Sequence, residues 1–116
     1  MSDAIFITGL LVHAHHGVMR HETKVGQQFA IDLAEAGASD KLVDTVSYAS
    51  IVEAATRAFT AKSFRLVEAA AQAIADEVLA SFPRVASVRV TVHKPHAPIA
   101  AIFGDVGVTI LRTRAI

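Results

Sequence analysis

The sequence predicts an α+β domain whose strands and helices follow the order β-β-α-α-β-β. Residues 4–12, 29–33, 87–93 and 106–110 are rich in β-branched or alternating apolar side chains, as in strands that bury one face. Between the second and third of these segments, apolar residues recur at intervals of three and four, which is typical of amphipathic helices. An antiparallel four-stranded sheet with both helices on one face satisfies this order.

The first two strands form a predicted antiparallel hairpin. Residues 13–27, which join them, are polar, contain two glycines and carry mixed charge, so we expect a long functional loop. Residues 34–47 form a second connector that is rich in turn residues. Ser47 at its end is suited to cap the helix that follows.

Two helices are predicted between the hairpins. The first spans residues 48–61, and its apolar face holds Ile51, Ala54, Ala55, Ala58 and Phe59. The second helix has an apolar face made of Leu66, Val67, Ala70, Ile74, Val78 and Leu79. Its alanines favour helix and permit close packing. Pro83 closes it.

The 116 residues form one predicted domain, residues 1–116, with 11 basic and 11 acidic side chains. This balance argues against nucleic acid or an anionic membrane as partner. No apolar run reaches the roughly 18 residues needed to cross a bilayer. The absence of cysteine excludes disulfides and thiolate-held zinc. We expect a cytoplasmic protein.

The apolar content is high, at 53% of residues. A small domain buries a smaller share of its surface than a large one does. Some apolar surface therefore has no place inside a monomer, and we expect the protein to form a homo-oligomer.

Four histidines crowd the first connector: His13, His15, His16 and His21. A strand would place His13 and His15 on the same side, as some metal sites require. Spacing fixes no third ligand, however, so the alternative is that these histidines are solvated or hydrogen-bonded. We expect no metal.

Lys94 is the first candidate catalytic residue. It ends a strand and precedes Pro95, which biases Lys94 to an extended conformation and makes its amine project from a rigid position. Residues 95–98 form a stiff turn that would wall a pocket. The alternative is a surface lysine at a strand end.

Three further residues complete a candidate set. Glu68 lies in the first turns of the second helix, where the helix dipole stabilises a carboxylate in any case. Tyr48 is the only tyrosine and begins the first helix, and Glu22 lies in the long loop. Packing or solvation alone is the alternative for Tyr48 and Glu22.

Taken together, the sequence resembles the dihydroneopterin aldolase family. The matching segments are His16-Gly17-Val18, Glu22, residues 26–29, residues 44–48, residues 66–68, Lys94-Pro95, residues 97–99 and residues 106–112. The resemblance implies the tunnelling fold, in which sheets join edge to edge into a ring with the helices outside. The resemblance also implies that two tetrameric rings stack into an octamer, with active sites between subunits.

The resemblance also implies an activity in folate biosynthesis. Dihydroneopterin aldolases cleave 7,8-dihydroneopterin into 6-hydroxymethyl-7,8-dihydropterin and glycolaldehyde, with epimerisation at C2′ as a related activity. This retro-aldol reaction needs neither metal nor other cofactor, because the dihydropterin ring carries a C=N bond at N5–C6 that accepts electrons once N5 is protonated. The protein must supply placement and proton transfer.

The catalytic roles implied by the resemblance fall on three residues. Lys94 would donate and accept a proton near N5 through water. Glu22 would bind the substrate side chain and tune Lys94. Tyr48, contributed by a neighbouring subunit, would contact the substrate and take part in protonating the intermediate.

The implied pterin-binding residues are Val67, Glu68 and Gln27, together with Glu22 and Tyr48. The Glu68 carboxylate would pair with the N2/N3 edge of the pterin, which presents two donors. The backbone at Val67 and Glu68 would hold the ring oxygen, and Gln27 would order the catalytic water.

Other functions remain open at this stage. A dihydroneopterin triphosphate 2′-epimerase would need cations, for which Arg20, Lys24 and Arg65 are the candidates. A zinc-dependent pterin synthase and a non-catalytic pterin-binding ring protein are further alternatives. One departure from the family is that Leu33 passes directly into the acidic connector, which suggests a shortened hairpin or an omitted segment.

Overall fold

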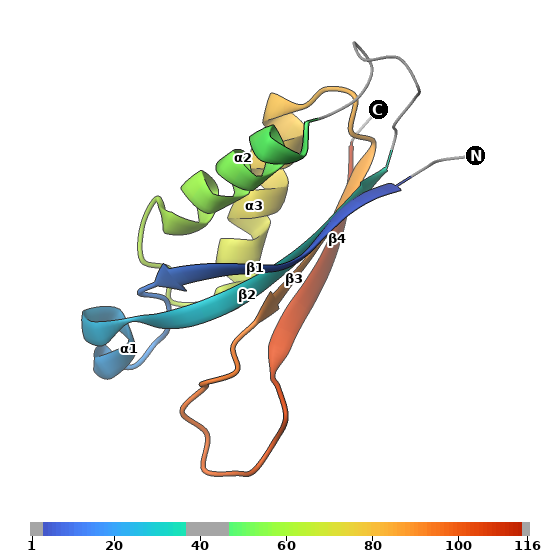
Figure 1. Cartoon of the computed structure of the whole chain (residues 1–116). Helices are drawn as coiled ribbons and strands as arrows, with labels where there is room; N and C mark the ends of the chain where they lie inside the picture. Colours follow the sequence, from blue (N-terminus) through green and yellow to red (C-terminus); the bar gives the residue numbers. More distant parts are fainter. Residues whose placement is uncertain (1–3, 37–46, 115–116) are drawn as a thin grey trace.

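A computed structural model describes residues 4–36 and 47–114. The four strands, β1 (Ala4–Ala14), β2 (Gln27–Ala36), β3 (Ser87–His93) and β4 (Gly107–Thr113), form one antiparallel sheet in the order β1-β2-β3-β4. Two helices, α2 (Tyr48–Thr60) and α3 (Val67–Ser81), lie side by side against one face of this sheet (Figure 1). The predicted β-β-α-α-β-β architecture is confirmed.

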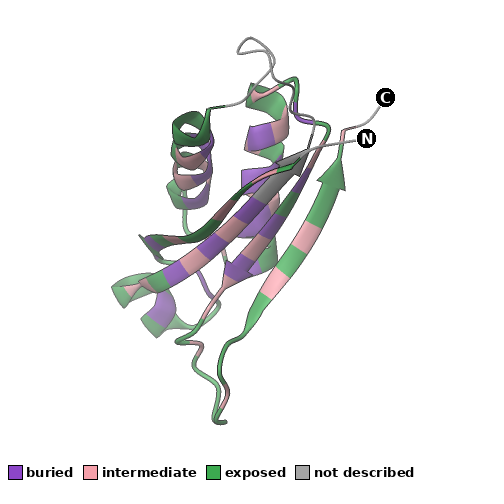
Figure 2. Cartoon of the chain, turned by 45° about the vertical axis from the view of Figure 1, so that its right-hand side comes forward, coloured by how far each residue is buried: buried purple, intermediate pink, exposed green. Residues whose placement is uncertain are grey.

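The core lies between the sheet and these two helices. Along β3 the side chains alternate between buried valines and less buried polar residues, as the sequence predicts (Figure 2). The large buried apolar side chains of the core include Phe29, Ile31, Leu33, Ile51, Phe59, Ile74, Val78, Val88, Val90 and Val92. The apolar faces of α2 and α3 supply the helical part of this set, as periodicity predicts. Leu66 is the exception: it precedes the first residue of α3 and is 54% exposed, so its assignment to the apolar face was wrong.

Apolar side chains also remain exposed on the sheet. Phe6 and Leu11 on β1 are 71% and 59% exposed, and Leu111 on β4 is 55% exposed. Their chain neighbours Ile7, Leu10, Val12 and Ile110 pack into or against the core, so the exposed side chains point to the face that the helices leave uncovered. β1 and β4 are also the two outer strands of the sheet.

A short helix, α1 (Arg20–Val25), interrupts the segment predicted to be a loop. Its six residues are too few for apolar periodicity to reveal it. The carboxylate of Glu22 accepts a hydrogen bond from the Met19 N–H at 3.3 Å, which helps the helix to begin. Gly26 follows its last residue.

The first hairpin is longer than the sequence predicts. β1 continues through Ala14, and β2 begins at Gln27 and continues three residues past Leu33. Its outer end pairs Ala4 with Ala36. Residues 37–46, which hold the acidic connector, lie outside the described residues.

His16 joins the end of β1 to the connection between α2 and α3. It is buried, its Nε2 donates a hydrogen bond to the Phe59 carbonyl at 2.8 Å, and its Nδ1 accepts one from the Phe64 N–H at 3.0 Å. These partners require a neutral ring with the proton on Nε2. The ring also packs against Phe29, Phe59 and Phe64.

Two other histidines of the predicted cluster, His13 and His15, also contact backbone. His13 Nε2 lies 3.3 Å from the Val25 carbonyl, and His15 Nδ1 lies 3.1 Å from the Thr23 carbonyl. Among residues 4–36 and 47–114, no three His, Cys, Asp or Glu side chains are placed to hold a metal ion. No helix in these ranges has the length and apolar character needed to span a membrane.

The buried position of His16 predicts a pH dependence of stability. Burial lowers the pKa of His16 below its usual 6.5, and the hydrogen bond to the Phe59 carbonyl opposes this effect without cancelling it. As pH falls below 6.5, the unfolded chain gains a proton at His16 that the folded chain does not bind. The stability contributed by His16 is therefore complete above that pH and is lost on acidification.

The matched variant is His16→Gln, which keeps a donor and an acceptor but does not titrate. We expect the unfolding free energy of the wild type to fall toward that of His16→Gln between about pH 7 and about pH 5. Urea unfolding at a fixed protomer concentration measures the difference. A constant difference over this range would contradict the prediction.

Candidate active site

A buried salt bridge joins the end of β3 to α1. Lys94 Nζ contacts Glu22 Oε2, and these two side chains are only 15% and 4% exposed. Lys94 directly follows β3, and its N–H donates to the Val106 carbonyl at 2.7 Å, which holds its backbone beside the start of β4. The structure thus brings together two residues that the sequence separates widely.

Glu22 is held from several sides. Gln27 Nε2 donates to Glu22 Oε2 at 3.2 Å, and the Met19 N–H donates to Oε1. Burial raises the pKa of Glu22, but the hydrogen bonds from Lys94 and the Met19 N–H outweigh it, so the net pKa lies below its usual value. Glu22 is therefore ionised at neutral pH, and the pair is a true salt bridge.

Gly17 makes room for this carboxylate. Its φ of 140° lies in the region that favours glycine, and its N–H donates to the Phe64 carbonyl at 2.9 Å. A Cβ atom at this position would lie 2.4 Å from Glu22 Cδ and Oε1. No residue with a Cβ fits while Glu22 keeps its place.

A cavity of about 240 Å³ opens on the Lys94 side of the salt bridge. It is lined by Val67, Glu68, Lys94, Ala97, Pro98, Ile99, Val106, Gly107 and Val108. The predicted stiff turn does wall a pocket, since both Ala97 and Pro98 line it. The walls are mainly apolar, with Lys94 and Glu68 as the charged groups.

A second cavity, of about 320 Å³, lies on the Glu22 side. Its lining includes His21, Glu22, Gln27 and His96. Pro98 lines both cavities, so the salt bridge lies where the two adjoin. Gln27 Oε1 is buried and has no hydrogen-bond partner among the described residues, which leaves one acceptor available there.

The N-terminus of α3 faces the first cavity. Val67 and Glu68 are the first two residues of this helix, where backbone N–H groups have no intrahelical acceptor. The Glu68 side chain is exposed and contributes carboxylate oxygens beside these donors. Donors and acceptors side by side suit the polar edge of a flat heterocycle.

Tyr48 is not brought to this site within one chain. It begins α2 and is 65% exposed. The start of α2 and the start of α3 lie at opposite ends of the helix layer (Figure 1). The other predicted residues, Lys94, Glu22, Gln27, Val67 and Glu68, line the two adjoining cavities.

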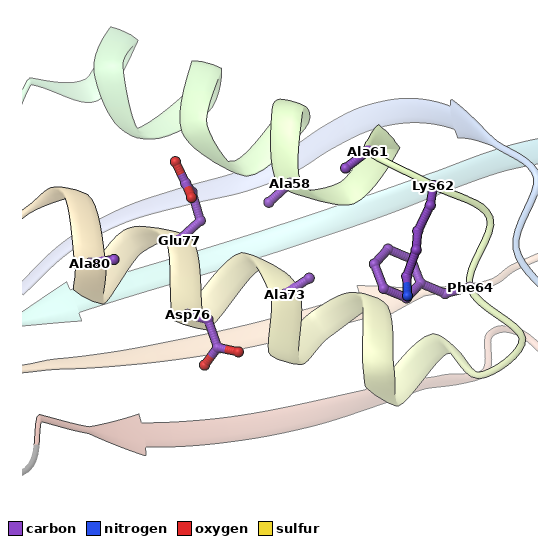
Figure 3. A pocket seen from close by; sticks show the side chains of 8 residues that line it. All are labelled: Ala58, Ala61, Lys62, Phe64, Ala73, Asp76, Glu77 and Ala80. Atoms are coloured by element: carbon purple, nitrogen blue, oxygen red, sulfur yellow. The ribbon is translucent and has the colours of Figure 1, made fainter.

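A larger concavity, about 470 Å³, lies between α2 and α3. Figure 3 shows that the short side chains of Ala58, Ala61, Ala73 and Ala80 form much of its lining. Of its two carboxylates, Glu77 is paired with Arg57 at 2.7 Å and Asp76 accepts a hydrogen bond from Gln72 at 2.7 Å. The concavity has more room than the other two but lacks a buried pair of reactive groups.

Sequence reasoning missed a polar network beside Lys94. His93 contacts the carboxylates of Asp32 and Asp105, at 2.6 and 2.5 Å. The sequence signal was only a polar residue at the end of an alternating strand. Nothing in the spacing connects His93 with Asp32, which lies 61 residues earlier.

Comparison with known proteins gives a consistent result. The family model described as FolB, dihydroneopterin aldolase, matches residues 5–111. A dihydroneopterin aldolase of Methylorubrum extorquens is 43% identical over 99% of this chain and 93% of its own length. One from Streptomyces coelicolor is 38% identical over 97% and 98% of the two chains.

A solved structure agrees with these relatives. The E. coli dihydroneopterin aldolase in complex with neopterin superposes with a TM-score of 0.83 at 34% identity. The match covers 95% of this chain and 98% of the E. coli chain.

The contact between Gly17 and Glu22 yields a prediction about stability. Gly17→Ala should lower the free energy of unfolding by about 2–4 kcal/mol, because the new methyl group meets both an unfavourable φ and the Glu22 carboxylate. Gly104→Ala is the matched control, since nothing lies within 4 Å of a Cβ there. Its effect should stay within about 0.5 kcal/mol. Equal effects in denaturant unfolding would show that Gly17 does not have this role.

Proposed function

The chain belongs to the dihydroneopterin aldolase family, and from this premise we propose that it cleaves 7,8-dihydroneopterin by a retro-aldol reaction. The enzymes of this name are aldehyde-lyases. The observation that supports the proposal most is the buried Lys94–Glu22 salt bridge between two adjoining cavities. We expect the enzyme in the cytoplasm, the location that the composition predicts.

The substrate itself supplies the electron sink for cleavage. The bond between C1′ and C2′ breaks, and its electrons enter the N5=C6 double bond to form an enamine between C6 and C1′. The C2′ hydroxyl loses its proton as glycolaldehyde leaves, and C1′ then gains a proton to give 6-hydroxymethyl-7,8-dihydropterin. Protons are only redistributed, so the protein must place the substrate and move protons.

Lys94 is the proposed proton donor and acceptor near N5. Lys94 lines the first cavity, and its amine is paired with the ionised Glu22. The unpartnered Oε1 of Gln27 is suited to orient a water molecule between Lys94 and the substrate. Glu22 also lines the second cavity, where it can contact the hydroxyl groups of the substrate side chain.

The N-terminus of α3 is the proposed pterin anchor. The Glu68 carboxylate can accept two hydrogen bonds from the N2/N3 edge of the ring. The backbone N–H groups of Val67 and Glu68 can donate to the ring oxygen, and the helix dipole favours an oxygen there. Val67, Ile99 and Val108 offer apolar surface to the ring faces.

Assembly completes the proposed site. Tyr48 lies far from Lys94 in its own chain, so it can contact substrate only in a neighbour's site, as the family resemblance implies. The outer strands β1 and β4 and their exposed apolar side chains support edge-to-edge joining into a ring. We propose a homo-octamer of two stacked tetrameric rings.

The alternative triphosphate substrate has weaker support. Arg20, Lys24 and Arg65 were the candidate cations for it, and none of them lines either of the two cavities at the salt bridge. The neutral hydroxyl groups of dihydroneopterin match the polar lining of the second cavity better.

Product analysis with two site variants tests the proposal. The protein should release glycolaldehyde from 7,8-dihydroneopterin. Lys94→Ala should lower kcat by about 10²- to 10⁴-fold with pterin affinity within about threefold, because it removes the acid and base and leaves the anchor. Glu68→Ala should chiefly weaken affinity.

The matched control is Lys62→Ala, which removes a lysine from the groove between α2 and α3. It should leave both quantities unchanged. No glycolaldehyde from the unmodified protein, or full turnover by Lys94→Ala, would contradict the proposal.

A further inference from the structure

A continuous chain of hydrogen bonds crosses the sheet beside the proposed site. The Gly9 N–H donates to Asp32 Oδ1 at 2.8 Å, and Asp32 Oδ2 lies 2.6 Å from His93 Nε2. His93 Nδ1 lies 2.5 Å from Asp105 Oδ2, and Asp105 Oδ1 accepts the Val106 N–H at 2.8 Å. The chain thus links β1, β2, β3 and the entry to β4.

This network is fully satisfied and charged. Each carboxylate uses one oxygen for a backbone N–H and the other for the imidazole, so His93 must donate from both ring nitrogens. The hydrogen bonds to Asp32 and then Asp105 raise the pKa of His93, while partial burial opposes them. A planar cation between two fixed anions has little freedom to move.

The network lies next to the backbone of Lys94 and of its hydrogen-bond partner Val106. His93 is the residue before Lys94, and Asp105 is the residue before Val106, whose carbonyl accepts the Lys94 N–H. Just beyond them, a Cβ atom on Gly107 would lie 2.2 Å from the Val92 carbonyl oxygen, so β3 and β4 approach closely here. The end of β3, which precedes Lys94, and the start of β4 beside it are therefore held at a fixed separation.

We propose that His93 is a positioning residue for the cleavage reaction. By bridging Asp32 and Asp105, it holds the Lys94 backbone in the geometry that brings the lysine amine to Glu22 and the substrate. This inference rests on the proposed function. A displacement of about 1 Å in a reacting group can cost about 10²-fold in rate.

The pterin anchor does not depend on this network. Val67 and Glu68 belong to α3, which lies against the opposite face of the sheet from His93. Loss of the His93 contacts should therefore affect kcat more than pterin binding. A loss of kcat without a matching loss of pterin affinity therefore distinguishes positioning of Lys94 from general damage to the site.

The test compares variants of the assembled protein. In His93→Phe, which removes both contacts, kcat for 7,8-dihydroneopterin should fall about 10- to 100-fold, with affinity for neopterin within about threefold. Asp105→Asn, which keeps an acceptor oxygen, should lose less activity than Asp105→Ala. Thermal unfolding and sedimentation show whether each variant stays folded and assembled.

The matched control is Thr91→Val. Thr91 lies on the same strand and face, and its hydroxyl is 2.9 Å from that of Thr109 on β4, so the change removes another bond between β3 and β4. Its kcat should stay within about twofold of the wild-type value. A similar loss of kcat in Thr91→Val and His93→Phe would overturn the proposal, because weakening of the sheet would explain both.

Other outcomes are equally decisive. Wild-type kcat in folded His93→Phe and Asp105→Ala, or parallel losses of kcat and neopterin affinity, would overturn the positioning role. Lack of turnover by the unmodified protein would instead contradict the proposed function. Hydrogen exchange of the Lys94 amide needs no turnover and should be faster in His93→Phe than in Thr91→Val; equal rates would show that His93 does not hold this backbone.

Discussion

The buried salt bridge between Lys94 and Glu22 is the constraint on which the rest of the site depends. Two charges removed from water are costly unless each is paired and hydrogen-bonded. The Met19 N–H and Gln27 compensate the carboxylate, and the missing side chain of Gly17 leaves space for it. Gly17 and Met19 lie between β1 and α1, and Gln27 begins β2 just after α1, so the Glu22 carboxylate is held by residues from both sides of this short helix.

The topology of the sheet brings the two halves of this pair together. In an antiparallel order β1-β2-β3-β4, the turn from β1 to β2 and the turn from β3 to β4 lie at the same end of the sheet. Glu22 belongs to the first turn and Lys94 to the second. His16 ties the first turn to the helix layer, and His93 ties the second to the neighbouring strands. Both histidines hold parts of the structure together, but buried His16 does so as a neutral ring and half-buried His93 as a cation.

Local patterns in the sequence predict most of the fold but only part of the site. Alternation reveals β3, and three- and four-residue spacing reveals α2 and α3, because each is long enough for its period to show. Lys94 is predicted to be rigid because Pro95 restricts it. No local rule pairs it with Glu22, and α1 is too short to carry a pattern. The family resemblance supplied that pairing, and the described geometry agrees with it. The network of His93 was invisible in the sequence, because its three members come from different strands and a loop.

The central claim is that Lys94 works as a proton-carrying partner of Glu22 while the substrate provides its own C=N bond. Borohydride reduction during turnover of 7,8-dihydroneopterin, followed by peptide mass spectrometry, tests this most directly. An amine that holds its proton in a salt bridge does not attack a carbonyl group. We expect no reduced adduct on Lys94 in protein that is turning over. A stable adduct on Lys94 would contradict the account, because it would show that the reaction passes through a lysine imine.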